Sequence, residues 1–205
     1  MMHHSGYDGV TLAGGRALRM GGGDKALLPL TDKPMLHHVI IRLAPQVRAL
    51  AINANGSADR FAAFGLPVLP DSIPGFPGPL AGILAAMDWC AARGGHTVIT
   101  VAGDTPFFPS DLVARLDSAR RPSAPCLATT PRPDGGLDWH PTFGLWPVEL
   151  RQSLRQAIDD GARKVLSWAQ HHGATSALFA QDPNPFFNVN TREDLIIARQ
   201  RAKQT

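Results

Sequence analysis

The chain has 205 residues, of which 44% are hydrophobic and 18% charged, with a formal net charge of +3. These ordinary values predict one globular domain over residues 1–205, and dispersed cations make nucleic acid an unexpected partner. No signal peptide and no apolar segment long enough to cross a bilayer is found. We therefore expect no membrane partner, and we expect a monomer.

Cysteine and histidine usage exclude the usual structural metal sites. Cys90 and Cys126 lie far apart and form no CxxC pair, so they are expected to be small buried hydrophobes of a reducing compartment, the cytoplasm. Six of the eight histidines occur as adjacent pairs, whose side chains point to different faces of a helix or strand. A structural zinc site is not expected.

The first predicted element is a short apolar strand at residues 10–12, followed by a loop with five glycines at positions 14–23. Arg16, Arg19 and Lys25 accompany the loop, and only Asp24 opposes them. Glycines let backbone N–H groups approach a ligand, and cations among them suit a polyanion. We expect this loop to bind a nucleoside triphosphate; the alternative is a surface loop with incidental charges.

The glycine loop matches neither common phosphate motif. A Walker-type loop requires a hydroxyl residue after its lysine, but Ala26 follows Lys25. The spacing from Gly14 to Gly21 also differs from G-x-G-x-x-G. The loop is therefore predicted to be a phosphate-binding element of another kind.

The next elements alternate between helix and strand. A helix with apolar residues at helical spacing begins near Pro34 and ends near Pro45, and strands are predicted at 49–52 and 66–69 around a brief helix at 58–64. Residues 71–79 form a loop rich in proline and glycine. A nearly uniformly apolar helix follows from residue 80, and then a central strand at 96–101.

The second half continues the alternation. We expect a helix at 110–119, then two strands at 126–130 and 140–146 separated by a polar turn at 132–138. Helices at 148–158 and 164–170, a short strand at 177–179 and a basic C-terminal helix complete the chain. This order predicts an α/β fold with a mostly parallel sheet covered on both faces.

Four candidate groups follow predicted strands: the glycine loop, Asn53, Asp71 and Asp104. In open α/β sheets, ligands bind beyond the carboxyl ends of the strands. The four groups are therefore expected to share one edge of the sheet.

Asp104 is the strongest candidate ligand for Mg²⁺, which prefers carboxylate oxygens and needs only one or two of them beside substrate phosphates. The alternative role is a turn residue before the next helix. Lys25 would act as a point charge and Arg19 as a forked donor to phosphate oxygens. No general base is required if the attacking group is an ionised phosphate.

Two further segments are candidates for acceptor binding. The helix that begins within residues 78–82 could receive a second anion at its N-terminus, or Gly82 could serve close helix–sheet packing. Asn188 and Asn190 lie on one side of an extended segment and could hydrogen-bond a ligand. The alternative for Asn190 is a helix cap, although Thr191 with Asp194 fits a capping box better.

The segments LAGGRALRMGGGDKALLPL, INAN, PGPLAG, GDTPF, HPTFGLW and FNVNTREDL occur in the order seen in the molybdenum cofactor guanylyltransferases. The chain resembles this family of the nucleotidyltransferase superfamily from residue 9 to about residue 196. The resemblance implies a Rossmann-like three-layer fold. It also implies Mg²⁺-dependent transfer of GMP from GTP to the terminal phosphate of molybdenum-molybdopterin, with release of pyrophosphate.

The resemblance also assigns roles to residues. It implies that Arg19, Lys25 and Asp104 are catalytic, with Asp104 holding the metal. The implied GTP-binding residues are Leu12, Ala13, Gly14, Gly15, Lys25, Asn53, Asp71 and Asp104. The implied acceptor-binding residues are Gly22, Gly78, Gly82, Asn188 and Asn190.

Three alternatives remain open at the level of sequence. The first is cytidylyl transfer to the same pterin, although LAGG at residues 12–15 favours guanylyl transfer because the related cytidylyl enzymes have LAAG. The second is nucleotide transfer to a sugar phosphate. The third is a nucleotide-binding adaptor without catalysis. Molybdenum-insertion proteins and molybdoenzyme chaperones are further expected partners.

Overall fold

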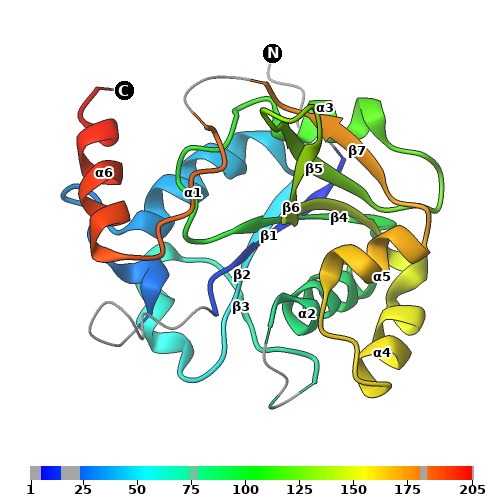
Figure 1. Ribbon diagram of the computed structural model, residues 1–205. Coiled ribbons are helices and arrows are strands. Elements are labelled where there is room, and N and C mark those ends of the chain that lie inside the picture. The colour runs from blue at the N-terminus through cyan, green and yellow to red at the C-terminus, as the bar shows by residue number, and fades with distance from the viewer. Residues whose placement is uncertain (1–5, 15–23, 74, 76–77, 181–183, 205) are drawn as a thin grey trace.

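The computed structural model describes residues 6–14, 24–73, 75, 78–180 and 184–204. Seven strands of this part of the chain form one sheet in the order β3-β2-β1-β4-β6-β5-β7 (Figure 1). The strands are β1 Asp8–Leu12, β2 Ala49–Asn53, β3 Val68–Leu69, β4 Thr97–Ala102, β5 Cys126–Pro131, β6 Leu137–Pro147 and β7 Thr175–Leu178.

The helices follow the predicted alternation. The α-helices are α1 Met35–Leu43, α2 Pro79–Ala92, α3 Leu112–Ala119, α4 Arg151–Asp159, α5 Val165–His171 and α6 Arg192–Ala202. Short 3-10 helices occur at η2 Lys25–Leu27, η3 Ala44–Gln46, η4 Ala58–Phe64 and η5 Val148–Leu150. The helix expected at 148–158 thus begins with a 3-10 turn.

Strand directions confirm the predicted mostly parallel sheet. β1 pairs in parallel with β2 and β4, β2 with β3, and β5 with β7. Only β6 runs against its neighbours, β4 and β5. The carboxyl ends of β1, β2 and β4 therefore meet at one edge of the sheet.

Each face of the sheet has its own apolar core. On one face, α1 and α3 pack Val39, Leu43 and Leu116 against the strands. On the other face, α2, α4 and α5 contribute residues such as Ile83 and Trp168 (Figure 1). Helices thus cover both faces of the sheet, which is the predicted three-layer arrangement.

Several predicted boundaries differ from the observed ones by about two residues, and the start of β6 differs most. The polar segment 132–138 was expected to be a turn, but β6 already begins at Leu137 and pairs Leu137 with Pro131 and Asp138 with Thr130. The turn is shorter than expected because the backbones of β5 and β6 continue to pair beyond the apolar core. Side chains there are exposed to solvent, so polar residues do not destabilise the strands. Sequence patterns that rely on apolar residues miss such an extension.

Candidate active site

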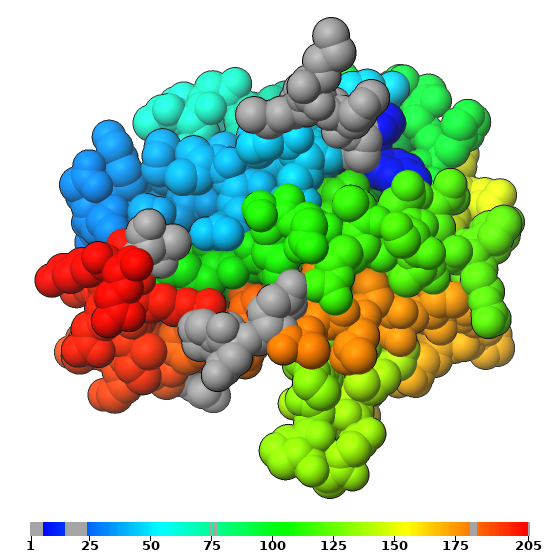
Figure 2. Space-filling model, turned by 90° about the horizontal axis from the view of Figure 1, so that it is seen from above, coloured from blue at the N-terminus to red at the C-terminus, as the bar shows by residue number. Residues whose placement is uncertain are grey.

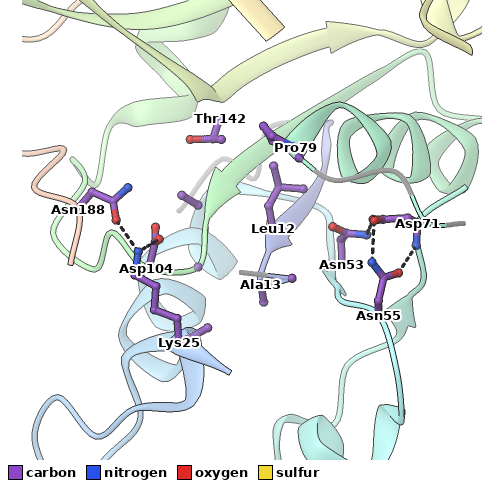
Figure 3. Close-up of a pocket in the computed structure, with 16 residues that line it drawn as sticks. Leu12, Ala13, Lys25, Asn53, Asn55, Asp71, Pro79, Asp104, Thr142 and Asn188 are labelled. Carbon is purple, nitrogen blue, oxygen red and sulfur yellow. Dashed lines mark hydrogen bonds and ion pairs between the residues drawn. The ribbon is translucent and has the colours of Figure 1, made fainter. Parts of the chain in front are cut away.

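A pocket of about 620 Å³ lies beyond the carboxyl ends of β1, β2 and β4 (Figure 3). The three strands end in register, with Leu12 beside both Asn53 and Ala102. Its lining residues are Leu12, Ala13, Gly14, Lys25, Ala26, Asn53, Asn55, Asp71, Gly75, Gly78, Pro79, Ala102, Gly103, Asp104, Thr142 and Asn188.

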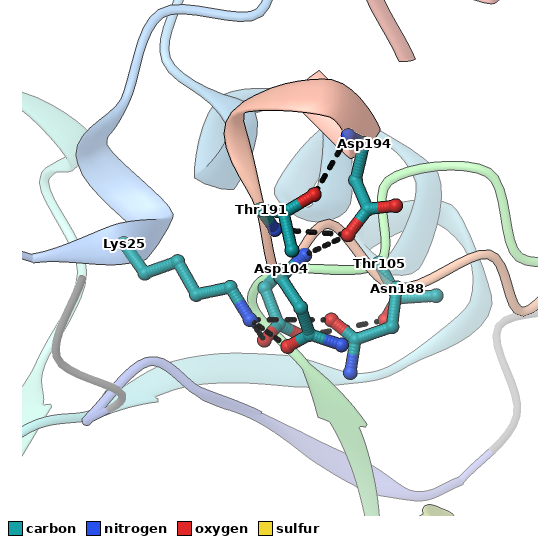
Figure 4. Close-up of polar contacts among 7 residues, drawn as sticks. Lys25, Asp104, Thr105, Asn188, Thr191 and Asp194 are labelled. Atoms are coloured by element: carbon teal, nitrogen blue, oxygen red, sulfur yellow. Dashed lines mark hydrogen bonds and ion pairs between the residues drawn. The ribbon is translucent and has the colours of Figure 1, made fainter. Parts of the chain in front are cut away.

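Lys25 and Asp104 meet at one end of this pocket. Lys25 Nζ lies 2.6 Å from Asp104 Oδ2, and the two side chains are 10% and 21% exposed. The same ammonium donates to Asn190 Oδ1 at 2.5 Å and to Asn188 Oδ1 at 3.4 Å (Figure 4). An ammonium has three donors, so these three acceptors fix its position.

The segment that carries Asn188 and Asn190 is itself anchored. Val189 N–H donates to the Asp104 carbonyl at 3.0 Å. α6 then begins with a capping box in which Thr191 and Asp194 exchange hydrogen bonds (Figure 4). The capping prediction is confirmed. The chain's last helix therefore holds two amide oxygens against Lys25.

The capping carboxylate is kept ionised. Burial alone raises the pKa of Asp194, but the backbone N–H groups of Asn190 and Thr191, the Thr191 hydroxyl and the charge of Lys25 outweigh it, so the pKa is lowered. The ionised carboxylate of Asp194 thus accepts the hydrogen bonds that cap the N-terminus of α6.

A second polar cluster occupies the other end of the pocket. Asn53 Nδ2 donates to Asp71 Oδ1 at 2.9 Å, and Asn55 Nδ2 donates to Asp71 Oδ2 at 2.7 Å. Asp71 N–H donates back to Asn55 Oδ1 at 2.9 Å. Figure 3 shows this cluster across Leu12 and Ala13 from Lys25 and Asp104. The pocket therefore has two polar ends and an apolar middle.

Two glycines allow the strands and α2 to approach this closely. A Cβ on Gly82 would lie 2.3 Å from Asn53 Oδ1 and 3.2 Å from Leu12 Cδ2. A Cβ on Gly103 would lie 3.1 Å from the Leu12 carbonyl oxygen. Residues with a side chain at either position would displace the pocket wall.

The sequence compares closely with proteins of one family. Residues 9–175 match the model of the MobA-like NTP transferase domain. A molybdenum cofactor guanylyltransferase of Bradyrhizobium sp. (strain ORS 278) is 48% identical over 95% of this chain and 92% of its own. Another, of Cereibacter sphaeroides, is 45% identical over 91% of this chain and 92% of its own.

The chain belongs to the molybdenum cofactor guanylyltransferase family. It is an enzyme of nucleotidyl transfer in molybdenum cofactor biosynthesis, as the sequence motifs implied.

Solved structures agree on the fold. A molybdopterin-guanine dinucleotide biosynthesis protein A of Archaeoglobus fulgidus superimposes with a TM-score of 0.72 at 20% identity, over 97% of this chain and 100% of its own. A putative glucose-1-phosphate thymidylyltransferase of Bacillus anthracis gives 0.77 at 13% identity, over 97% and 96%. At these identities the likeness shows the nucleotidyltransferase fold alone.

Most of the residues that family resemblance singled out lie together. Leu12, Ala13, Gly14, Lys25, Asn53, Asp71, Gly78, Asp104 and Asn188 line the pocket, and Asn190 contacts it through Lys25. Gly82 instead lies behind Asn53, which favours the packing alternative for it. Gly15, Arg19 and Gly22, and with them most of the glycine loop, lie outside the described residues.

Gly78 has a backbone reason to be glycine as well. Its φ is +121°, a conformation that residues with a side chain rarely adopt, and it directly precedes Pro79 at the first position of α2. This conformation lets α2 begin at the edge of the pocket, where Gly78 and Pro79 line it.

Two residues that line the pocket, and one that contacts the first of them, were not among the candidates from sequence. Asn55 completes the hold on Asp71, and Thr142 enters from β6. Arg60 forms an ion pair with Asp24 and donates to the Asn55 carbonyl, linking the end of the glycine loop to the Asp71 cluster. Asn55 and Thr142 could have been found in the INAN and HPTFGLW segments, but no pattern marks Arg60.

Two further features concern metal and membrane binding in the part of the chain that the structure describes. There, no group of three or more His, Cys, Asp and Glu side chains is placed to share a metal ion. No helix there is long and apolar enough to cross a membrane.

Proposed function

We propose that the chain transfers GMP from GTP to the terminal phosphate of molybdenum-molybdopterin. The acceptor oxygen forms a bond to the α-phosphorus of GTP, the bond from that phosphorus to the β-phosphate oxygen breaks, and pyrophosphate leaves. The observation that best supports this proposal is the contact of Lys25 with Asp104 at the pocket end where Asn188 and Asn190 also lie. Family membership favours guanylyl transfer over the sugar-phosphate alternative.

The two polar ends suggest how GTP lies in the pocket. A volume of about 620 Å³ suits a nucleotide. The phosphates would lie near Lys25, whose charge attracts them. The nucleoside would extend over Leu12 and Ala13 toward Asp71, whose carboxylate oxygens accept hydrogen bonds and suit a donor on the base or ribose.

Asp104 fits a magnesium site. It presents a carboxylate that is partly exposed to the pocket, and Mg²⁺ typically takes one or two carboxylates with substrate phosphates and water. Bound there, Mg²⁺ would neutralise charge on the phosphates. Lys25 would then shift from Asp104 toward the phosphate oxygens, while the amide oxygens of Asn188 and Asn190 keep its ammonium oriented.

Catalysis in this proposal depends on charge and position. The acceptor phosphate is ionised at neutral pH, so no protein base has to remove a proton from it. Lys25 stabilises the negative charge that builds on the departing pyrophosphate. Gly78 and the N-terminus of α2 lie beside the pocket, where the acceptor's phosphate would approach.

The test is a product analysis. The enzyme is incubated with Mg²⁺, either GTP or CTP, and either molybdenum-loaded pterin or a sugar phosphate as acceptor. The release of pyrophosphate is measured, and the mass of the pterin product is determined by mass spectrometry. We expect release with GTP and a product heavier by one guanylate. Release with CTP but not GTP would assign the cytidylyl reaction, and release only with sugar phosphates would assign the other alternative. GTP binding without any release would assign the adaptor role.

The cellular setting follows from the same proposal. The two cysteines are free and buried, which fits a reducing compartment, and we place the reaction in the cytoplasm. Proteins that insert molybdenum would supply the acceptor, and molybdoenzyme chaperones would collect the product. We further propose that residues 1–205 act as one domain and as a monomer.

A further inference from the structure

A second hollow, of about 410 Å³, lies away from the nucleotide pocket. Its walls come from α1, from residues 106–110 after β4, and from the end of α6. These segments adjoin on the face seen in Figure 2, in blue, green and red respectively. Hollows of this size bind small molecules rather than large surfaces.

The wall contributed by α1 carries an uncompensated charge. Arg42 lines the hollow, and no acid among the described residues lies within ion-pair distance of its guanidinium. Burial lowers the pKa of Arg42, so its guanidinium stays charged but is less well solvated than that of an exposed arginine. An anion placed against the guanidinium would offset that loss of solvation.

Two further polar side chains line the hollow. His38 lies one helical turn before Arg42, and its Nε2 is 3.1 Å from Thr31 Oγ1. The Ser110 hydroxyl lies on the opposite wall, and no hydrogen bond ties it to the rest of the described chain. The hollow thus offers a forked cation on α1 and a hydroxyl donor on the segment 106–110.

Each of the three walls also carries an apolar residue. Ile41 is 53% exposed, although it is a large aliphatic residue. Phe107 lies opposite, with the guanidinium of Arg201 4.5 Å from the centre of its ring, and Ala202 closes the end. A ligand here would gain from an apolar body next to its charged group.

We propose that this hollow binds a small organic oxyanion, a carboxylate or a phosphate monoester on an apolar body. Arg42 holds two oxygens of the anionic group, and Ile41, Phe107 and Ala202 contact the body. The site is separate from the nucleotide pocket and does not depend on the proposed function.

The test uses two probes with one body and different anionic groups, benzoate and phenyl phosphate. Binding is followed by NMR of ¹³C-labelled isoleucine and alanine methyl groups, because Ile41 and Ala202 report on this hollow and not on the nucleotide pocket. We expect at least one probe to shift both signals with a Kd on the order of 1 mM, as suits a ligand of about ten non-hydrogen atoms. The stronger probe identifies the anionic group.

Two variants decide the role of the charge. Arg42→Gln should weaken binding at least about tenfold, whereas Arg121→Gln, which removes the same charge from an exposed position outside the hollow, should leave it unchanged. A thermal melt checks that both variants fold. Unmoved Ile41 and Ala202 signals with both probes, or undiminished binding by Arg42→Gln, would overturn the proposal. Equal affinity for inorganic phosphate and phenyl phosphate would also overturn it, because Ile41, Phe107 and Ala202 would then add nothing to the affinity.

Discussion

At the scale of single residues, the site depends on an ammonium held by three oxygen acceptors. Lys25 contacts one carboxylate and two amides that come from distant parts of the chain. The carboxylate neutralises the ammonium in the absence of substrate, and the amides orient it without adding charge. In the proposed mechanism the ammonium exchanges Asp104 for phosphate oxygens while the two amides keep it oriented.

Asp104→Asn tests that arrangement. The amide keeps the shape of the side chain but loses the charge that suits Mg²⁺, so kcat should fall at least about 100-fold while the Kd for GTP rises only a few-fold. Steady-state kinetics and equilibrium binding of GTP measure the two effects. Asp111→Asn, a change at an exposed carboxylate, is the matched control. An Asp104→Asn enzyme with normal turnover would remove Asp104 from the reaction.

His140 makes stability depend on pH. Its ring stacks on Phe186 with centroids 4.4 Å apart, its Nε2 lies 2.9 Å from Thr130 Oγ1, and burial lowers its pKa from 6.5 to about 4. The unfolded chain therefore takes up this proton at a higher pH than the folded chain. The stability that the neutral ring provides is full above pH 6.5 and is lost as the pH falls toward 4.

His140→Gln should remove that loss. With allowance for the partial exposure of the ring, wild type should lose about 1–2 kcal/mol more than the variant between pH 7 and pH 4. Urea unfolding at the two pH values measures this difference. Parallel pH profiles for the two proteins would show that His140 is not the titrating group.

The sequence identifies which residues belong to the site more readily than which of their side chains contact one another. Asn188 and Asn190 were recognised as a pair on one side of an extended segment, but nothing in the spacing indicates that they meet Lys25, more than 160 positions earlier. Arg60 was missed because it lies in a short 3-10 helix without periodicity. Contacts of this kind depend on how the strands are ordered in space.

At the scale of elements, the apolar patterns predicted the core well. α2 is buried on almost every side and was recognised from its composition, and the parallel strands β1, β2 and β4 follow short apolar runs. The extension of β6 to Leu137 was not predictable, because an exposed hairpin keeps pairing through its backbone while its side chains are polar. The sequence analysis also did not predict that β6 runs antiparallel to β4 and β5.

Gly82→Ala tests the contact between α2 and β2. The new methyl group would collide with Asn53 Oδ1 and push that side chain away from Asp71. Alanine favours helix, so a gain in stability is expected from propensity alone. We expect instead a loss of about 1–3 kcal/mol in the free energy of unfolding and weaker GTP binding.

Chemical denaturation and GTP titration measure both effects. Gly6→Ala is the control, since a Cβ there meets nothing within 4 Å. Unchanged affinity for GTP in a Gly82→Ala protein of normal stability would show that Asn53 tolerates the methyl group.

At the scale of the whole molecule, the pocket joins the two cores. Ala13 and Ala102 belong to the core under α1 and α3, whereas Leu12 packs against the core under α2. A nucleotide that contacts all three strand ends would bind the folded chain and not the unfolded one. Binding should therefore raise the stability of the whole chain.

A thermal melt in the presence of Mg²⁺ measures this linkage. At a GTP concentration 100-fold above its Kd, stability should rise by about 2.7 kcal/mol, which corresponds to an increase in Tm of about 5–10 °C for a chain of this size. CTP at the same concentration should give a smaller shift if the pocket selects guanine. A larger shift with CTP would contradict the proposed choice of base.

The contact of Lys25 with Asn188 and Asn190 has a consequence for synthesis of the protein. Lys25 is translated more than 160 residues earlier than Asn188 and Asn190, which can contact it only once they too have been translated. Until then Lys25 has at most Asp104 to orient it. The seven strands of the described sheet all precede Asn188, so a growing chain can complete this sheet while Lys25 still lacks both amide acceptors; on the role proposed for Lys25, transfer can begin only after Asn190 has been translated.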